Sequence, residues 1–404
     1  MRKYRHLTGQ PIFSQLLSTI NFNLISKVAR ENNSDRYYKK FKTREHLITM
    51  LYCIFHKCTS IREVTTGMQA CVHKLNHLGM TYCPRKSTLS DANKSRSPKV
   101  FEDIFKEVYL SLRRSLPDSR NKNPWFKKLY IIDSTSISLF KEILKNGGGR
   151  TPSNGKRKGG IKVHSLMKAD EDVPCFVRIT SGATHDVTFI KGLKLPRGSF
   201  LTFDKGYFDY KQYALWTRQN VSWVTRMKAT GSHTLVKENL VDSDSKLKGV
   251  ISDQKILLGY KQRPVNKQID ARLITYYDKE KERTFRFITN NQTLKPETIA
   301  LIYKHRWQIE LIFKRVKQNF PLEYFLGDNA NAIKIQIWIA LIADLMIKYL
   351  KRKLRKSWSF SNLTSMIRLH LMSYFDLIQF LENPEKALIN NSQVLPRGPT
   401  LFDY

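Results

Sequence analysis

The pattern of apolar and polar positions divides the chain into a helical beginning, a strand-rich middle and a helical end. Within residues 1–115, the stretch Glu45–His56 is strongly apolar and predicts a buried helix. Thr59 or Ser60 can cap a further helix starting at Ile61, because short hydroxyl side chains accept the free N–H groups of a first helical turn. We therefore expect a helical N-terminal domain.

A short polar segment follows, with Ser87 as its predicted N-cap. Helix, turn and short helix with basic residues nearby are typical of a DNA-reading helix-turn-helix. A small helical bundle without a DNA-reading role explains the same pattern. The sequence leaves both interpretations open.

The middle of the chain has the composition of strands. Residues 128–140 are rich in β-branched side chains and predict a buried strand, and Phe200–Phe203 predicts another. A glycine-rich basic loop at 146–160 separates them, and we expect its cations to meet phosphate. Residues 230–290 alternate apolar and polar positions with turn residues between the runs, which predicts several more strands.

Helices resume at Pro296, because proline suits the first position of a helix, and the pattern stays helical to residue 380. The most apolar run, Ile335–Ile347, is flanked by Lys334 and Lys348. It is too short to cross a bilayer and predicts a buried helix. We expect no membrane association.

The charge of the chain indicates the kind of partner that it binds. The 404 residues are 41% hydrophobic, enough for a large core, yet 70 lysines and arginines outnumber 34 acids to give a formal net charge of +36. The excess is spread over the whole length, which fits a protein laid along a polyanion. A membrane-surface protein would concentrate its charge on one helix.

Five cysteines and the polar, basic segment Met1–Ser14 favour a reducing, cytoplasmic compartment with free thiols. Several cysteines and histidines crowd between Cys53 and Cys83, which raises the question of zinc. However, no C-x2-C pair is present and several of these residues fall on apolar helical faces. Free core cysteines are the better interpretation.

Two aspartates lie where strands end in apolar company. Asp133 follows Leu129–Ile132, and Asp204 follows the strand Phe200–Phe203. An aspartate at such a position is costly unless it is paired, hydrogen-bonded or bound to a metal ion. Each could also be an ordinary strand-to-turn residue. Together with Glu310 from a helix, they would form a site of hard oxygen ligands for Mg²⁺, with Mn²⁺ as a substitute.

Glu310 itself lies in a stripe of cations and aromatic residues, Y-K-H-R-W-Q-I-E-L-I-F-K-R-V-K. Tyr303, Arg306, Glu310 and Lys317 follow the pattern Y-x2-R-x3-E-x6-K, whose offsets fall on one face of a single helix. An ordinary amphipathic helix with a basic face is the alternative. A carboxylate amid cations suits a site that holds a metal ion and also grips phosphates.

These motifs resemble those of DDE transposases of the insertion-sequence-four family, whose signature is the Y-R-E-K helix. The segment T-F-D-K-G-Y at 202–207 resembles the family's second-aspartate motif, usually D-R-G-Y, with Lys205 in place of arginine. The segment Y-I-I-D-S-T at 130–135 resembles its first-aspartate strand. The match in order and spacing covers roughly residues 125–350.

The resemblance implies a ribonuclease-H-like fold of class α/β, with a β-rich insertion and helical terminal regions. It implies that Asp133, Asp204 and Glu310 are the catalytic metal ligands. It further implies that Tyr303, Arg306 and Lys317 hold phosphates near the cleaved end, since arginine forks onto phosphate and lysine supplies a point charge. The neighbouring residues that we expect to contact DNA are Lys314, Trp307, Lys205 and Arg226.

In relatives that form a hairpin at the transposon end, a flipped base stacks on an aromatic residue. Trp223, Trp307 or a tyrosine of the insertion could serve here. The expected partners are double-stranded DNA, both terminal inverted repeats and target, and a second copy of the chain within the DNA complex. The expected location is the bacterial cytoplasm, associated with the nucleoid.

The predicted organisation is a helical DNA-binding domain at 1–115, a catalytic core at 125–229 and 291–350, a β-rich insertion at 230–290 and a helical C-terminal region at 351–404. The predicted function is metal-dependent DNA cleavage and strand transfer. Two alternatives remain: a related nuclease that cuts without joining strands, and an inactive DNA-binding protein such as a domesticated repressor. The presence of all three acids argues against the repressor.

Overall fold

The computed structural model describes residues 9–118, 123–138, 160–259, 269–322 and 324–386. It divides into a helical unit, Met1–Leu116 with Arg315–Tyr404, and a sheet unit, Pro117–Lys314. In this division, residues 315–350, which the sequence assigns to the predicted core, cluster with the helical unit. The basic loop predicted at 146–160 lies outside the described residues up to residue 159.

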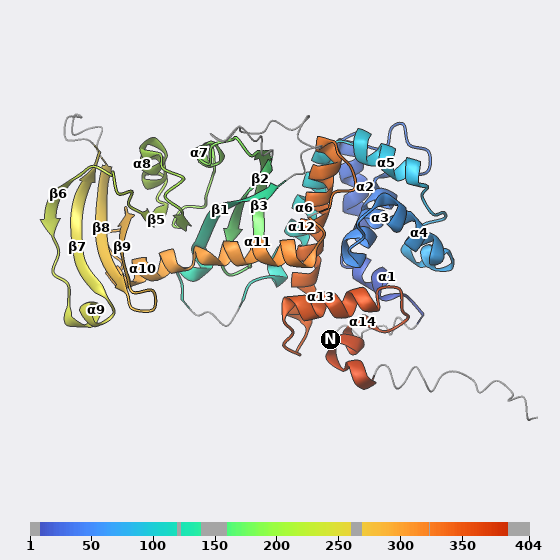
Figure 1. Cartoon of the computed structure of the whole chain (residues 1–404). Helices are drawn as coiled ribbons and strands as arrows, with labels where there is room; N and C mark the ends of the chain where they lie inside the picture. Colours follow the sequence, from blue (N-terminus) through green and yellow to red (C-terminus); the bar gives the residue numbers. More distant parts are fainter. Residues whose placement is uncertain (1–8, 119–122, 139–159, 260–268, 323, 387–404) are drawn as a thin grey trace, which may run out of the picture. The chain divides into compact units, whose positions relative to one another are not determined.

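The helical unit is built around two buried helices (Figure 1). α3 and α12 contribute most of its core, and α5, α6 and α13 pack against α12. The helices and 3-10 turns of the N-terminal part are α1 (Ile12–Leu17), α2 (Phe22–Glu31), α3 (Thr43–His56), α4 (Ile61–Ala70), η1 (Val72–Leu78), α5 (Lys86–Ser95), α6 (Pro98–Leu112) and η2 (Arg113–Ser115). Those of the C-terminal part are α12 (Ala330–Lys353), α13 (Phe360–Leu369) and α14 (Leu377–Glu382).

Two predicted helix starts had different outcomes. Ser60 caps α4 as predicted, since its hydroxyl accepts the Glu63 backbone N–H at 3.2 Å. The prediction for Ser87 was wrong: α5 begins at Lys86, with Arg85 at the N-cap position. Because the helix starts earlier than expected, Ser87 already lies in its first turn.

The apolar helix α12 is longer than the sequence suggested. It runs for 24 residues and is long and apolar enough to cross a bilayer, so the expectation that it is too short was wrong. However, 83% of its most apolar window is buried inside the protein, as expected for the core helix of a globular unit. It is the one helix in the described part of the chain that meets these length and composition criteria.

The sheet unit contains one nine-stranded mixed sheet, in the order β3-β2-β1-β4-β5-β9-β8-β7-β6. β1, β4 and β5 pair in parallel, and the remaining pairs are antiparallel. The strands are β1 (Leu129–Ser138), β2 (Gly160–Lys168), β3 (Val173–Ser181), β4 (Phe200–Phe203), β5 (Ser222–Arg226), β6 (His233–Glu238), β7 (Val250–Leu258), β8 (Ile269–Asp278) and β9 (Arg283–Thr289). The short helices along them are η3 (Phe126–Lys128), α7 (Val187–Ile190), α8 (Tyr210–Arg218) and α9 (Ser243–Leu247).

The strands of the predicted insertion continue this sheet. β9 pairs antiparallel with β5, with Val224 opposite Thr289, and β8, β7 and β6 follow outward to the edge at β6 (Figure 1). A buried ion pair links the extension to the segment before α10 (Pro296–Lys304), since Arg272 donates to both carboxylate oxygens of Asp253 and to the Leu294 carbonyl. This contact therefore ties β7 and β8 to the segment that leads into α10.

Candidate active site

Asp133 lies within β1 and is mostly buried. Its Oδ1 accepts the backbone N–H of Ser134 at 2.8 Å, and its side chain is 17% exposed. Burial raises the pKa of Asp133 to about 6, and the nearby carboxylates of Glu310 and Asp204 act in the same direction. The two predicted partner acids are therefore close enough to act on Asp133 electrostatically.

Asp204 follows β4 directly, as the sequence predicted. β4 pairs in parallel with β1, with Phe203 opposite Ile132, so the next residue of each strand is an aspartate. Arg226, the last residue of β5, donates to Asp204 Oδ1 at 2.9 Å. Burial alone would raise the pKa of Asp204, but the hydrogen bond and charge of Arg226 outweigh it and lower that pKa. Parallel pairing thus brings Asp133, within β1, next to Asp204, just past the end of β4.

The Y-R-E-K segment does not form a single helix, which corrects the prediction. α10 ends at Lys304 and α11 runs from Trp307 to Asn319. Between them the backbone tightens, with Arg306 N–H donating to the Tyr303 carbonyl three residues back at 3.0 Å. The His305 ring packs against Phe126, with centroids 4.9 Å apart. This packing of His305 on η3 accompanies the break.

Because Arg306 lies at this break, it bridges two of the acids. Its Nη1 donates to Asp133 Oδ2 at 2.8 Å, and its Nη2 donates to Glu310 Oε1 at 2.6 Å. The Tyr303 hydroxyl donates to Asp204 Oδ1 at 3.4 Å. Burial raises the pKa of Tyr303 to about 12, so the phenol stays protonated and available as a donor at neutral pH.

The three acids offer a divalent cation the right kind of ligand atom. Carboxylate oxygens are the ligands that Mg²⁺ prefers, and these three acids already gather positive partners around them. In the described part of the chain, however, no three histidine, cysteine, aspartate or glutamate side chains lie at metal-binding spacing. Instead, Arg306 and Arg226 form ion pairs with the carboxylates.

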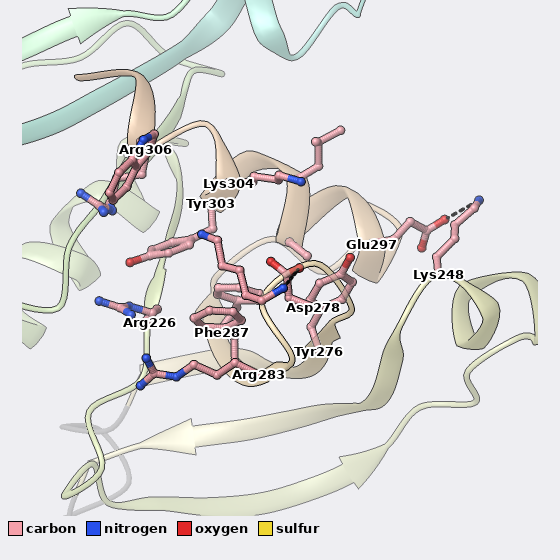
Figure 2. Close-up of a pocket in the computed structure, with 15 residues that line it drawn as sticks. Arg226, Lys248, Tyr276, Asp278, Arg283, Phe287, Glu297, Tyr303, Lys304 and Arg306 are labelled. Carbon is pink, nitrogen blue, oxygen red and sulfur yellow. Dashed lines mark hydrogen bonds and ion pairs between the residues drawn. The ribbon is translucent and has the colours of Figure 1, made fainter. Parts of the chain in front are cut away.

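A cavity of about 660 Å³ adjoins these residues, between the sheet extension and α10 (Figure 2). Tyr303, Arg226 and Arg306 lie at one end, and the ion pair of Lys248 with Glu297 lies at the other. Cations and aromatic rings dominate the remaining lining, which includes Tyr276, Lys281, Arg283, Phe285, Phe287, Lys304 and Trp307. Such a lining suits a polyanion that also carries flat rings.

The predicted DNA contacts are distributed unevenly. Trp307, Lys205 and Lys314 are exposed, and Arg226 is committed to Asp204. Lys317 belongs to the helical unit and stays a prediction. Trp223 is fully buried against Tyr213, with ring centroids 4.7 Å apart, so it is wrong as a candidate for stacking on a flipped base. Trp307, 54% exposed and lining the cavity, remains available.

Sequence reasoning missed one acid close to the site. Asp186 precedes α7, and its Oδ1 accepts hydrogen bonds from Ser134 Oγ at 2.9 Å and Lys162 Nζ at 3.2 Å. Its local signal, an aspartate after His185 in a turn, is weak. His164 on β2 is fully buried beside Asp186.

A model of the Transposase DDE domain family matches residues 124–346, which span the strands and helices that carry Asp133, Asp204 and Glu310. The chain belongs to this family. A second model, a domain of unknown function (DUF4372), matches residues 8–81 in the helical unit of the transposase. The DDE match also means that the inactive-repressor alternative is not favoured.

Relatives with transposase names are similar to this chain over most of its length. The transposase is 29% identical over 315 residues to "Putative transposase y4zB" of Sinorhizobium fredii (strain NBRC 101917 / NGR234), covering 78% of this chain and 84% of the relative. It is 26% identical over 358 residues to "Probable transposase for insertion sequence element IS5377" of Geobacillus stearothermophilus, covering 88% of each. A cryo-EM structure of a piggyBac transposase synaptic complex with hairpin DNA aligns with 100% of this chain and 89% of that chain, at 13% identity and a TM-score of 0.46.

Proposed function

We propose that this transposase cleaves DNA at the terminal inverted repeats of its own insertion sequence and joins the freed ends to target DNA. Transposases bind DNA, and members of the DDE family generally use divalent metal ions. The observation that carries the proposal is the bridge made by Arg306, which contacts Asp133 of β1, 173 positions earlier in the sequence, and Glu310 of α11. This contact gathers acids and cations beside a basic, aromatic cavity.

In this proposal Asp133, Asp204 and Glu310 hold Mg²⁺ or Mn²⁺. The bound ions would activate the attacking oxygen and stabilise the leaving oxygen of an in-line phosphoryl displacement. Arg306 and Arg226 then turn from the carboxylates toward the phosphates on either side of the scissile bond, because a guanidinium forks equally well onto carboxylate or phosphate. Tyr303 donates one further hydrogen bond to phosphate. The cavity receives the nucleotides next to the cut.

The finer assignments belong to the same proposal. The core is ribonuclease-H-like and of the Y-R-E-K type, although the signature is divided between two helices here. The helical segment 1–115 binds the inverted repeats, and two copies of the chain act together on paired ends. The enzyme works on chromosomal DNA in the bacterial cytoplasm, with Lys314, Lys317, Lys205 and Trp307 as further DNA contacts.

Cleavage of end-labelled DNA carrying the element's inverted repeats tests this function. Asp133→Asn, Asp204→Asn and Glu310→Gln should each lower single-turnover cleavage in Mg²⁺ by at least about 1000-fold, since each removes an oxygen ligand needed for the chemistry. DNA binding should stay close to wild type, because affinity comes mainly from cations on phosphates. Glu238→Gln on exposed β6 is the matched control and should cleave normally.

A wild-type rate in any of the three variants would overturn the assignment of that residue. A strand-transfer assay with a supercoiled target separates transposase from nuclease. Joined products support the proposal, and cleavage without joining supports the nuclease alternative.

DNA affinity should fall steeply with salt. A protein of net charge +36 that contacts many phosphates releases many counterions on binding. For six to ten phosphate contacts, we expect a loss of roughly 1000-fold or more between 50 and 200 mM salt. Fluorescence anisotropy with a labelled inverted repeat measures this, and a nearly flat plot of log affinity against log salt would contradict it.

A further inference from the structure

The sheet face behind Asp133 carries a second polar cluster. Successive side chains of a strand point to opposite faces, so Ser134 faces away from Asp133. Ser134 pairs with His164 on β2, and Lys162 lies two residues further along the same face of β2. All three side chains converge on the Asp186 carboxylate, which is brought there by the turn before α7.

Asp186 is tightly held at this position. Its Oδ1 accepts the hydroxyl of Ser134 at 2.9 Å and the ammonium of Lys162 at 3.2 Å, and His164 Nδ1 lies 3.6 Å away. Burial lowers the pKa of His164 to about 4, so its ring is neutral at physiological pH and the Lys162 ammonium supplies a counter-charge to Asp186. The His164 ring stacks on Phe189 of α7, with centroids 5.2 Å apart. Packing and charge together fix the carboxylate.

Ser134 connects this cluster to the catalytic face. Its side chain donates to Asp186 on one face of β1, and its backbone N–H donates to Asp133 Oδ1 at 2.8 Å. The other oxygen of Asp133 accepts Arg306. When Arg306 turns to phosphate, as proposed above, the Ser134 N–H becomes the contact that still orients Asp133.

The second oxygen of Asp186 faces the Asp204 segment. A methyl group at Gly206 would lie 3.7 Å from Asp186 Oδ2 and 3.8 Å from Asp204 Oδ2. The Gly206 N–H donates to Asp204 Oδ2 at 3.3 Å. Asp186 therefore lies against both segments that carry the strand-end aspartates, behind Asp133 and beside Asp204.

We propose that Asp186 is a positioning residue of the active site: through Ser134 it holds the Asp133 carboxylate in the orientation needed to bind a divalent ion. This inference rests on the proposed function. Groups that orient metal ligands from behind typically change metal affinity or activity by about 10-fold to 100-fold when they are removed. Lys162 balances the charge of Asp186, so that the orienting acid does not add to the repulsion among the catalytic acids.

The test compares Asp186→Ala, Asp186→Asn, Ser134→Ala and the double variant Asp186→Ala with Ser134→Ala in the full-length protein. Thr180→Ala on β3 is the matched control, because Thr180 bonds His164 on the same face but not Ser134. Mn²⁺ binding in the presence of inverted-repeat DNA, followed by electron paramagnetic resonance, is the first readout. Single-turnover cleavage against Mg²⁺ concentration is the second, and thermal unfolding monitors the fold.

We expect Asp186→Ala and Ser134→Ala each to weaken Mn²⁺ binding and the apparent Mg²⁺ affinity by about 10-fold. The double variant should be no worse than either single variant, because both remove the same link. Asp186→Asn keeps an acceptor oxygen for Ser134 and should recover part of the loss. Thr180→Ala should bind Mn²⁺ normally, and inverted-repeat affinity should be unchanged throughout.

Normal Mn²⁺ and Mg²⁺ dependence in Asp186→Ala would overturn the positioning role while leaving the proposed function intact. Losses that multiply in the double variant would also overturn it, since independent effects need no shared link. If wild type bound Mn²⁺ with the expected Asp186 dependence but did not cleave DNA, the proposed function would fail and the positioning role would stand. A wild-type protein that neither bound Mn²⁺ nor cleaved DNA would overturn both.

Discussion

Two arginines that are mostly shielded from solvent, one in each unit, differ in the charge that surrounds them. In the helical unit, Arg96 donates to His46 Nδ1 at 2.9 Å and to the Phe41 carbonyl at 3.1 Å, and it pairs with Asp35 at 3.5 Å. In the sheet unit, Arg306 bridges Asp133 and Glu310, and Asp204 lies nearby. Arg96 has one acid and neutral partners, whereas Arg306 faces a surplus of negative charge.

The surplus is what distinguishes the two sites. Around Arg96, the loop before α3 is tied to α3 and to the end of α5, and the guanidinium side chain is only 1% exposed. Around Arg306, the pKa of Asp133 is raised to about 6 despite the arginine, because burial and neighbouring acids outweigh it. An acid cluster that one arginine does not neutralise is suited to a further cation, and this difference leads to three predictions.

The largest expected effect is on the folding of the helical unit. Arg96→Ala removes a buried guanidinium and leaves His46 Nδ1 and the Phe41 carbonyl without this donor, while Asp35 keeps its hydrogen bonds from Thr43, so it should destabilise the protein by about 3 kcal/mol. Urea unfolding followed by circular dichroism measures this. A change below about 0.5 kcal/mol would mean that Arg96 is not a structural anchor.

Unlike Arg96→Ala, Arg306→Ala should lower the rate of DNA cleavage more than the stability of the fold. We expect single-turnover cleavage to fall about 100-fold, a loss typical of removing one transition-state donor. Arg306→Lys should lose less cleavage activity, because lysine keeps the positive charge and loses only the bidentate hydrogen bonds of the guanidinium. Binding of the inverted repeat should change far less, since many other cations share that load. If Arg306→Ala cleaved DNA at the wild-type rate, the catalytic role assigned to this arginine would be wrong.

The third prediction is a pH dependence carried by His46, whose effect is small near neutral pH and grows as the pH falls. Burial, followed by the charge of Arg96, lowers the pKa of His46 to about 3, so the folded state keeps the ring neutral. The unfolded state, with a pKa near 6.5, binds a proton that the folded state does not as pH falls from about 6.5 to 3. Stability from this residue is therefore present above pH 6.5 and lost toward pH 3, by up to about 1.4 kcal/mol per pH unit.

Urea unfolding at several pH values, with His46→Gln beside wild type, isolates this slope. The variant is less stable overall but should lose less stability between pH 6.5 and 4. Parallel curves for the two proteins would show that His46 titrates alike in the folded and unfolded states.

The sequence by itself determined the local features of this transposase. The β-branched run before Asp133 and the apolar run before Asp204 predict the strands β1 and β4, because burial and strand preference act within a few residues. Pro296 begins α10 and Ser60 caps α4, since both positions depend only on the adjacent backbone. The family resemblance rests on the same short motifs.

Only the tertiary structure decided which distant residues meet. The register of β1 on β4 brings two aspartates together, and the contact of His305 with η3 accompanies the break that lets Arg306 bridge Asp133 and Glu310. The burial of Trp223 and the approach of Asp186 to Ser134 likewise depend on packing. These contacts join residues tens to hundreds of positions apart, and their energies depend on the folded geometry, which no local pattern of side chains contains.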